Sequence, residues 1–118
     1  SQIDKYICEP NVTIRKAQKQ DELAEQFDLK KLFKNGSLFT SSELKEGFPG
    51  RVFKVEKELT SKKEIIKLKN AEVIAKNFPL TANDFKKKHK LGASSLKFIL
   101  VFTDYLGKKR MILCNKEK

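Results

Sequence analysis

The sequence predicts an α+β fold, an α/β sandwich in which short helices pack on a mixed sheet. Apolar and polar residues alternate in segments such as residues 52–56, helix-capping sequences precede other segments, and strand-like and helix-like segments follow one another along the chain. The 118 residues are 39% hydrophobic and include nine Phe. That is enough for the core of one ordinary domain, or of two very small units that share a core.

Short elements are expected in the first fifty residues. Residues 6–8 have a strand pattern that ends at Glu9-Pro10, and the apolar residues that follow predict one or two short amphipathic helices. Asn35-Gly36 is a strong turn signal and predicts a small hairpin. Thr40-Ser41-Ser42-Glu43 resembles a helix-capping box. We place the boundary between a unit of residues 1–50 and a second unit of residues 51–118 at Phe48-Pro49-Gly50.

The second unit shows a clearer succession of elements. A strand over residues 52–56 is followed by a helix that Ser61-Lys62-Lys63-Glu64 caps, and by a strand over residues 71–78 that Pro79 ends. Thr81-Ala82-Asn83-Asp84 caps the next helix, and Gly92 stands where a left-handed C-terminal cap is expected. Residues 96–105 and 110–114 then predict a hairpin that turns at Leu106-Gly107. The order of the strands in the sheet does not follow from this pattern.

The net charge of +11 lies entirely in the second unit. Residues 1–50 carry eight Lys or Arg and eight Asp or Glu, whereas residues 51–118 carry eighteen and seven. A compact basic surface attracts polyanions by long-range steering and by counterion release. Nucleic acid is the commonest such partner, so the charge favours binding of RNA or DNA.

Three basic clusters contribute most visibly to this excess. The densest is Lys86-Lys87-Lys88-His89-Lys90, predicted on a helix that directs Phe85 and His89 inward and Lys87 and Lys90 outward. The others are Lys62-Lys63 and Lys108-Lys109-Arg110. Such groups suit phosphate contacts but read no base by themselves. Each cluster alone is also typical of a solvated surface, and we expect His89 to pack at the edge of the core rather than to act in catalysis.

The sequence offers no recognisable catalytic constellation. It has no glycine-rich nucleotide loop, no Ser/His/Asp or Cys/His set and no metal-ligand spacing, and neither Asp84 nor Asp104 has an obvious acidic partner. We therefore expect a non-catalytic chain without a metal or cofactor of its own. Aromatic stacking is not expected to be the main binding device, because the Phe residues of the second unit occupy predicted core positions and only Tyr105 lies near a turn.

The composition also bounds the setting of the protein. Cys8 and Cys114 stand alone near opposite ends, which predicts reduced, structural thiols. The longest purely apolar run, residues 98–102, is far too short to span a membrane, so we expect a cytoplasmic protein with no membrane partner. The chain begins at Ser1 without an initiator Met, which leads us to expect a piece of a longer protein.

A series of short motifs resembles one protein family. They are Glu9-Pro10, Ile14-Arg15-Lys16-Ala17, Leu38-Phe39-Thr40-Ser41, Phe48-Pro49-Gly50-Arg51-Val52-Phe53 and Asn77-Phe78-Pro79-Leu80. In order and spacing they resemble the C-terminal region of bacterial class I SAM-dependent methyltransferases, a small ferredoxin-like unit followed by a THUMP-like domain. The resemblance implies an upstream domain that binds S-adenosylmethionine, and a C-terminal piece that presents an RNA, tRNA or rRNA, to it. Arg15, Lys16 and Arg51 fall on matched positions. Gly92-Ala93-Ser94-Ser95 departs from the Gly-rich acidic turn expected before the last hairpin.

Two interpretations of the basic residues compete with RNA binding. The apolar residues of the first unit could dock on the upstream methyltransferase domain while the basic unit serves solubility alone. The polyanion could also be DNA or an anionic lipid.

A surface where the two units meet could gather Arg15, Lys16 and Arg51 beside the lysine-rich helix, or Arg51 could simply pair with an acidic residue near the Phe-Pro-Gly turn.

Overall fold

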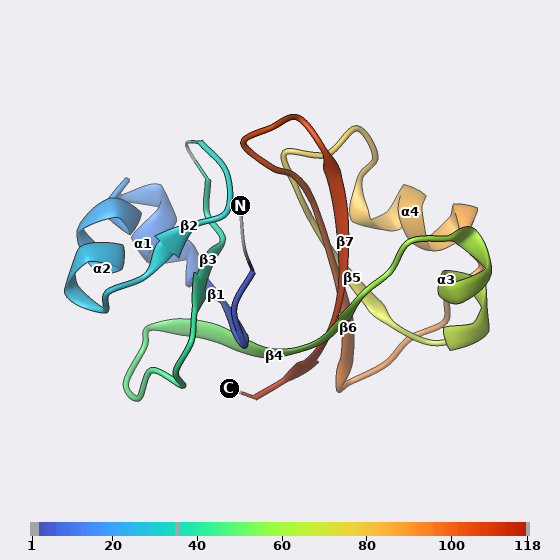
Figure 1. Ribbon diagram of the computed structural model, residues 1–118, viewed down its shortest axis with the longest axis horizontal. Helices are drawn as coiled ribbons and strands as arrows, with labels where there is room; N and C mark the ends of the chain where they lie inside the picture. Colours follow the sequence, from blue (N-terminus) through green and yellow to red (C-terminus); the bar gives the residue numbers. More distant parts are fainter. Residues whose placement is uncertain (1–2, 35, 118) are drawn as a thin grey trace.

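The computed structural model describes residues 3–34 and 36–117, and within them the chain forms an α+β fold with one mixed sheet (Figure 1). The sheet has the strand order β2-β3-β1-β4-β7-β6-β5. Its strands are β1 (Tyr6–Pro10), β2 (Lys30–Lys31), β3 (Phe39–Ser41), β4 (Gly50–Glu58), β5 (Glu72–Lys76), β6 (Lys97–Thr103) and β7 (Lys109–Lys116). The helices are α1 (Val12–Lys16), α2 (Gln20–Gln26), α3 (Lys62–Leu68) and α4 (Ala82–Lys88). The strand pairs are antiparallel except for β5 and β6, which α4 connects as a crossover.

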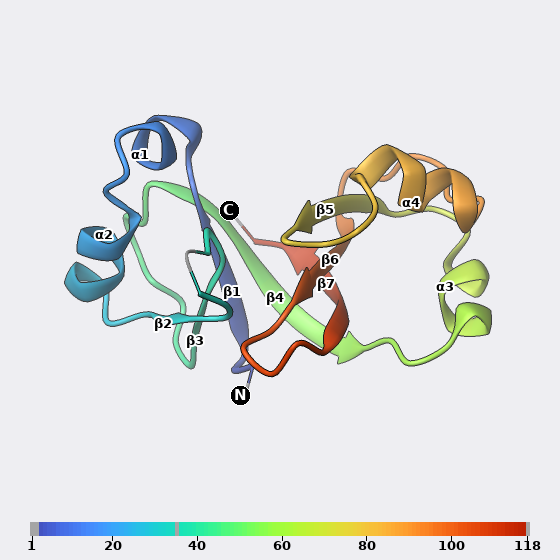
Figure 2. The same cartoon turned by 90° about the horizontal axis from the view of Figure 1, so that it is seen from above.

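Strand β4 joins the two halves of the sheet. Its first residues pair with β1, in a register that sets Arg51 opposite Glu9, and its later residues pair with β7. A register shift lies between Val55 and Lys57, where a bulge bends a strand and increases its twist. Figures 1 and 2 show β4 running from the half that carries α1 and α2 to the half that carries α3 and α4. The sheet therefore curls instead of lying flat.

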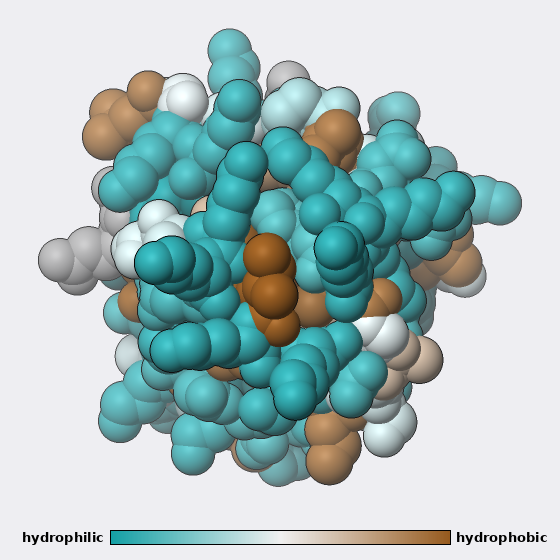
Figure 3. Space-filling model, turned by 90° about the vertical axis from the view of Figure 1, so that its right-hand side faces the viewer, coloured by the Kyte–Doolittle hydropathy of each residue, from teal (hydrophilic) through white to brown (hydrophobic). Residues whose placement is uncertain are grey.

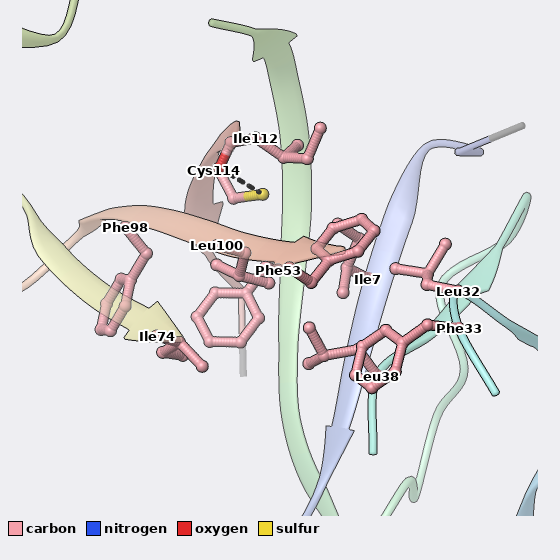
Figure 4. Packing of buried hydrophobic residues seen from close by; sticks show 11 residues of the cluster. Ile7, Leu32, Phe33, Leu38, Phe53, Ile74, Phe98, Leu100, Ile112 and Cys114 are labelled. Atoms are coloured by element: carbon pink, nitrogen blue, oxygen red, sulfur yellow. Dashed lines mark hydrogen bonds between the residues drawn. The ribbon is translucent and has the colours of Figure 1, made fainter. Parts of the chain in front are cut away.

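The side of the sheet without helices encloses the largest group of buried residues. Ile7 from β1, Phe53 from β4 and Phe102 from β6 meet there, and Phe33 stacks on Phe102 with ring centroids 5.8 Å apart. Figure 4 shows these strands directing their apolar side chains toward one another, with the segment around Leu38 closing the group from the N-terminal side. The two halves thus share one core, which fits a chain of this size.

Helices cover the outer sides of the curled sheet. Leu23 of α2 packs with Cys8 and Val52 on the outer side of the N-terminal half. Ile65 of α3 and Phe85 of α4 pack on Ile99 and the outward-facing residues of β5–β7. Because side chains of a strand alternate between its two faces, Cys8 and Val52 lie outside where Ile7 and Phe53 lie inside.

Most local predictions of elements agree with the structure. Ser61 Oγ accepts a hydrogen bond from the Glu64 amide at 3.3 Å and Thr81 Oγ1 accepts one from the Asp84 amide at 3.1 Å, so both predicted helix caps are confirmed. The last hairpin turns at Gly107, which has a φ of 81°. The strands β2 and β3 pair as a hairpin, while Asn35, half of its predicted turn signal, lies outside the described residues.

Two local predictions are wrong. Thr40 and Ser41 belong to β3 and do not cap a helix, because β3 pairs with β1 and Thr40 Oγ1 donates to the Tyr6 carbonyl at 2.9 Å. Gly92 does not supply the left-handed cap of α4. Lys90 does so with a φ of 56°, and Gly92 is instead needed for space, since a Cβ there would meet the side-chain oxygen of Asn70.

The two cysteines are buried and free, as expected of structural thiols. Burial raises the pKa of Cys8 to about 11 despite the opposing charge of Lys45, and raises that of Cys114 to about 12. Both thiols are therefore protonated at neutral pH. Among the described residues, no helix has the length and apolar character needed to cross a membrane.

Candidate nucleic-acid interface

Helix α4 presents the densest group of basic side chains at one end of the molecule. Phe85 and His89 are buried on the side of the helix that faces the sheet. Lys86 Nζ lies 3.0 Å from Glu72 Oε1. Lys87, Lys88 and Lys90 are exposed and make no ion pair within residues 3–34 and 36–117. Figure 3 views this end, where hydrophilic side chains cover most of the surface around a few apolar ones. Lys86 neutralises the Glu72 carboxylate, whereas the charges of Lys87, Lys88 and Lys90 remain exposed to solvent.

A hollow of about 370 Å³ opens beside α4 and gathers members of all three predicted basic clusters. Lys62 comes from the start of α3, Lys88 from α4 and Lys109 from β7. Its apolar lining comes from both helices, the β5–α4 connection and β7, namely Ile65, Phe78, Pro79, Leu80, Phe85 and Met111, and His89 completes it. We call the hollow and the exposed lysines of α3, α4 and the β6–β7 turn the lysine face. It combines an apolar floor with a cationic rim.

His89 stays uncharged in this setting. Its side chain is 5% exposed, and its ring lies 4.4 Å from that of Phe85, measured between centroids. Burial lowers the pKa of His89, and the charges of Lys88 and Lys62 lower it further. The predicted place at the edge of the core is confirmed, and the imidazole adds no charge to the lysine face at neutral pH.

Arg110, the third member of the last basic cluster, is used inside the protein. Its Nε and Nη2 lie 2.6 and 2.9 Å from the two carboxylate oxygens of Glu58, and its Nη1 lies 3.1 Å from Asp104. Burial raises the pKa of Asp104, but hydrogen bonds from the Lys108 amide, Arg110 and the Leu106 amide outweigh it, so the pKa is lowered overall. Arg110 and Asp104 thus shape the turn that carries exposed Lys108 and Lys109. Lys63 is also exposed at the start of α3.

A second basic group surrounds Glu9 at the end of β1. The Glu9 side chain is 4% exposed, and its Oε1 lies 2.7 Å from Nη2 and 2.7 Å from Nε of Arg51. Its Oε2 lies 3.5 Å from Arg15 Nη1 and 3.4 Å from Lys76 Nζ. We call these four residues the Glu9 cluster. Lys76 ends β5, four strands away from β1 in the sheet, so the curl of the sheet brings it here.

The structure decides between the two alternatives for Arg15, Lys16 and Arg51. Arg51 pairs with an acidic residue, and its guanidinium carbon lies 5.6 and 5.7 Å from the ring centroids of Phe53 and Phe98. Figures 1 and 2 place α1, which carries Arg15 and exposed Lys16, at the opposite end of the molecule from α4. The alternative in which Arg15, Lys16 and Arg51 lie beside the lysine-rich helix is therefore wrong, and the alternative in which Arg51 pairs with an acidic residue near the Phe-Pro-Gly turn is confirmed.

The predicted burial of the aromatic residues holds. Phe53, Phe85, Phe98 and Phe102 are buried, and Tyr105 is 53% exposed. Phe78 is only partly buried and lines the hollow of the lysine face.

Comparison with known families shows which family the chain belongs to. Residues 50–116 match the THUMP domain-like family, and residues 6–49 match a ferredoxin-like domain. The chain belongs to the THUMP domain-like family. Its THUMP-like part contains the whole lysine face, together with Arg51 and Lys76, while the ferredoxin-like part contributes Glu9 and Arg15 to the Glu9 cluster.

One solved structure resembles the whole chain. It is described as the crystal structure of a "putative methyltransferase from Porphyromonas gingivalis W83", and matches with 30% sequence identity and a TM-score of 0.89. The match covers 100% of this chain and 31% of the other, so the chain spans about a third of that protein's length. A search of curated proteins found no match.

Sequence reasoning missed Glu9 and Lys76 as members of a site. A signal for Glu9 was present, because it is two residues beyond the inward-facing Ile7 and so shares its buried strand face. A carboxylate on a buried face needs cationic partners. Lys76 carried no such signal, since its partner is 67 positions away and meets it through the curl of the sheet.

Proposed function

We propose that this chain is an RNA-binding module of a SAM-dependent RNA methyltransferase, and that it presents tRNA or rRNA to a catalytic domain upstream in the same polypeptide. The observation that carries the proposal is the lysine face, in which three basic clusters far apart in sequence meet around one hollow. The chain itself is non-catalytic in this proposal. S-adenosylmethionine belongs to the upstream domain.

Charge and family both support RNA as the ligand. The unpaired lysines supply the sequence-independent phosphate contacts that dominate nucleic-acid affinity. THUMP domains in general bind RNA. The structurally similar protein from Porphyromonas gingivalis is described as a "putative methyltransferase". Double-stranded RNA is recognised largely by its shape and by contacts to its phosphates and 2′-hydroxyl groups, and the exposed lysines of the lysine face can make such phosphate contacts.

A titration by fluorescence anisotropy tests the proposal. The ligands are total tRNA, a DNA duplex of equal charge and heparin, each across a series of salt concentrations. The chain is expected to prefer tRNA, with an affinity that falls steeply as salt rises. Replacement of Lys62, Lys88 and Lys109 by Gln should weaken tRNA binding at least about tenfold, and should lower the slope of log affinity against log salt concentration by about two to three, because three phosphate contacts are lost.

The matched control replaces Lys5, Lys19 and Lys34 by Gln. These exposed residues lie in the N-terminal half and form no ion pair with a described residue. Their replacement lowers the net charge by the same amount as the triple variant of the lysine face. Equal weakening by both triple variants would mean that net charge alone attracts RNA. Equal affinity for heparin and tRNA, or no binding, would favour the alternative that the chain is a module that docks on the methyltransferase domain.

The surface of the N-terminal half gives that alternative little support. Among its described residues, the exposed large hydrophobic side chains are Val12 at 53% and Leu44 at 37%. Single exposed apolar residues are normal on soluble proteins, whereas a docking surface needs a contiguous patch.

A further inference from the structure

A hollow of about 490 Å³ is lined by Glu9, Arg15 and Arg51 of the Glu9 cluster and by residues at the start of α1. Glu9, Asn11 and Arg15 line it from the N-terminal half, and Gly50 and Arg51 line it from β4. Gly50 allows the two strands to approach here, because a Cβ on Gly50 would collide with the Glu9 carbonyl oxygen. The hollow is therefore built by elements from both halves of the chain.

The charges around this hollow do not balance. Arg15, Arg51 and Lys76 surround a single carboxylate, so the Glu9 cluster keeps two positive charges. The Glu9 side chain is 4% exposed, whereas those of Arg15, Lys76 and Arg51 are 27%, 25% and 41% exposed. Glu9 thus holds the cations from below, and their outer sides remain open to a ligand.

Hydrogen-bond donors also remain in the hollow. Arg15 lines the hollow with a side chain that is 27% exposed, and among the described residues its guanidinium contacts Glu9 through Nη1 alone. Arg51 contacts Glu9 through Nε and Nη2, which leaves Nη1 without a hydrogen-bond partner among the described residues, and its guanidinium carbon lies 5.6 and 5.7 Å from the Phe53 and Phe98 ring centroids. Asn11 uses its Oδ1 to cap α1, which leaves the Nδ2 amide as a donor.

We propose that the Glu9 cluster is a binding site for a phosphate monoester, either the terminal phosphate of an RNA or that of a free mononucleotide. Guanidinium groups fit phosphate oxygens with paired donors. A monoester carries nearly two negative charges at neutral pH and so cancels the excess, whereas a backbone diester carries one and leaves a positive charge behind. The proposal does not depend on RNA binding at the lysine face.

Isothermal titration with methyl phosphate at constant ionic strength tests the chemistry, with dimethyl phosphate as the diester comparison. We expect saturable one-to-one binding of the monoester and clearly weaker binding of the diester. Arg15→Gln should weaken the monoester about tenfold, because it removes one charge-assisted contact. Lys19→Gln is the matched control, an exposed residue of the same half without an ion pair to a described residue, and should leave the affinity unchanged.

A Lys76→Gln variant controls for misfolding of Arg15→Gln. Both variants should bind methyl phosphate weakly while their thermal unfolding stays cooperative. The source of the phosphate follows from a second comparison, between adenosine 5′-monophosphate and a 5′-phosphorylated trinucleotide, each with its 5′-hydroxyl counterpart. Preference for either phosphorylated ligand supports the site. Absence of saturable binding, equal affinity for the diester, or equal weakening by Lys19→Gln would overturn it.

Discussion

The two basic regions of this molecule use their cations in opposite ways. On the lysine face, Lys62, Lys88 and Lys109 stand around an apolar hollow without ion pairs to described residues. In the Glu9 cluster, each cation contacts one buried carboxylate. Lysine is a flexible point charge, whereas arginine presents a planar set of donors. The lysine face therefore suits many phosphates along a polymer, and the Glu9 cluster suits one fixed group.

The comparison also shows why the net charge of a segment does not locate a binding surface. Arg51 and Arg110 count toward the basic excess of residues 51–118, yet both are held by carboxylates at 2.6–2.7 Å. Surface lysines without partners count equally in composition but remain available to a ligand. The difference between the regions lies in the acidic residues near each cation.

The largest effect is expected where the Glu9 cluster is broken. Glu9→Gln removes the charge that holds three cations together and should lower the free energy of unfolding by about 2 kcal/mol, less than the roughly 3–5 kcal/mol typical of a fully buried ion pair because the cations are partly solvated. Urea unfolding of both proteins measures the difference. Glu25→Gln, at an exposed position of α2, is the control and should change stability by less than about 0.5 kcal/mol. Equal effects would show that Glu9 does not organise the cluster.

A smaller effect is expected from His89 on the lysine face. Because its pKa is lowered in the folded protein, the unfolded chain takes up a proton more readily, and stability must fall as the pH drops below the unfolded value of about 6.5. This fall is at most about 1.4 kcal/mol per pH unit for one proton. Urea unfolding at pH 7.5 and 5.5 should show a shallower loss for His89→Leu than for the unmodified chain. Parallel losses would show that burial and the charges of Lys88 and Lys62 do not lower the pKa of His89 in the folded protein.

Much of the fold follows from local sequence. The caps at Ser61 and Thr81, the turn at Gly107 and the alternation in β4 depend on neighbouring residues, and all appear as predicted. The capping box at Thr40 failed because pairing of β3 with β1, a contact between distant segments, overrides the local preference. Left-handed caps were also hard to place, since Gln18, Asp28 and Lys90 adopt them without glycine.

The candidate sites were less predictable, because they depend on the strand order. Lysines of the three basic clusters were recognised from composition, but their meeting at one hollow required α3, α4 and β7 to be placed in space. The pairing of Lys76 with Glu9 required the curl of the whole sheet. Periodicity within a segment gives the face on which a residue lies, but not which distant segment that face will meet.

The most direct test of the central claim is a two-dimensional amide NMR titration of this chain with a short RNA hairpin that lacks terminal phosphates. We predict chemical-shift changes in α3, α4 and the turn around Lys108 and Lys109, with little change at Glu9 and Arg15. Changes concentrated in residues 5–50, or none at saturating RNA, would contradict RNA binding by the lysine face.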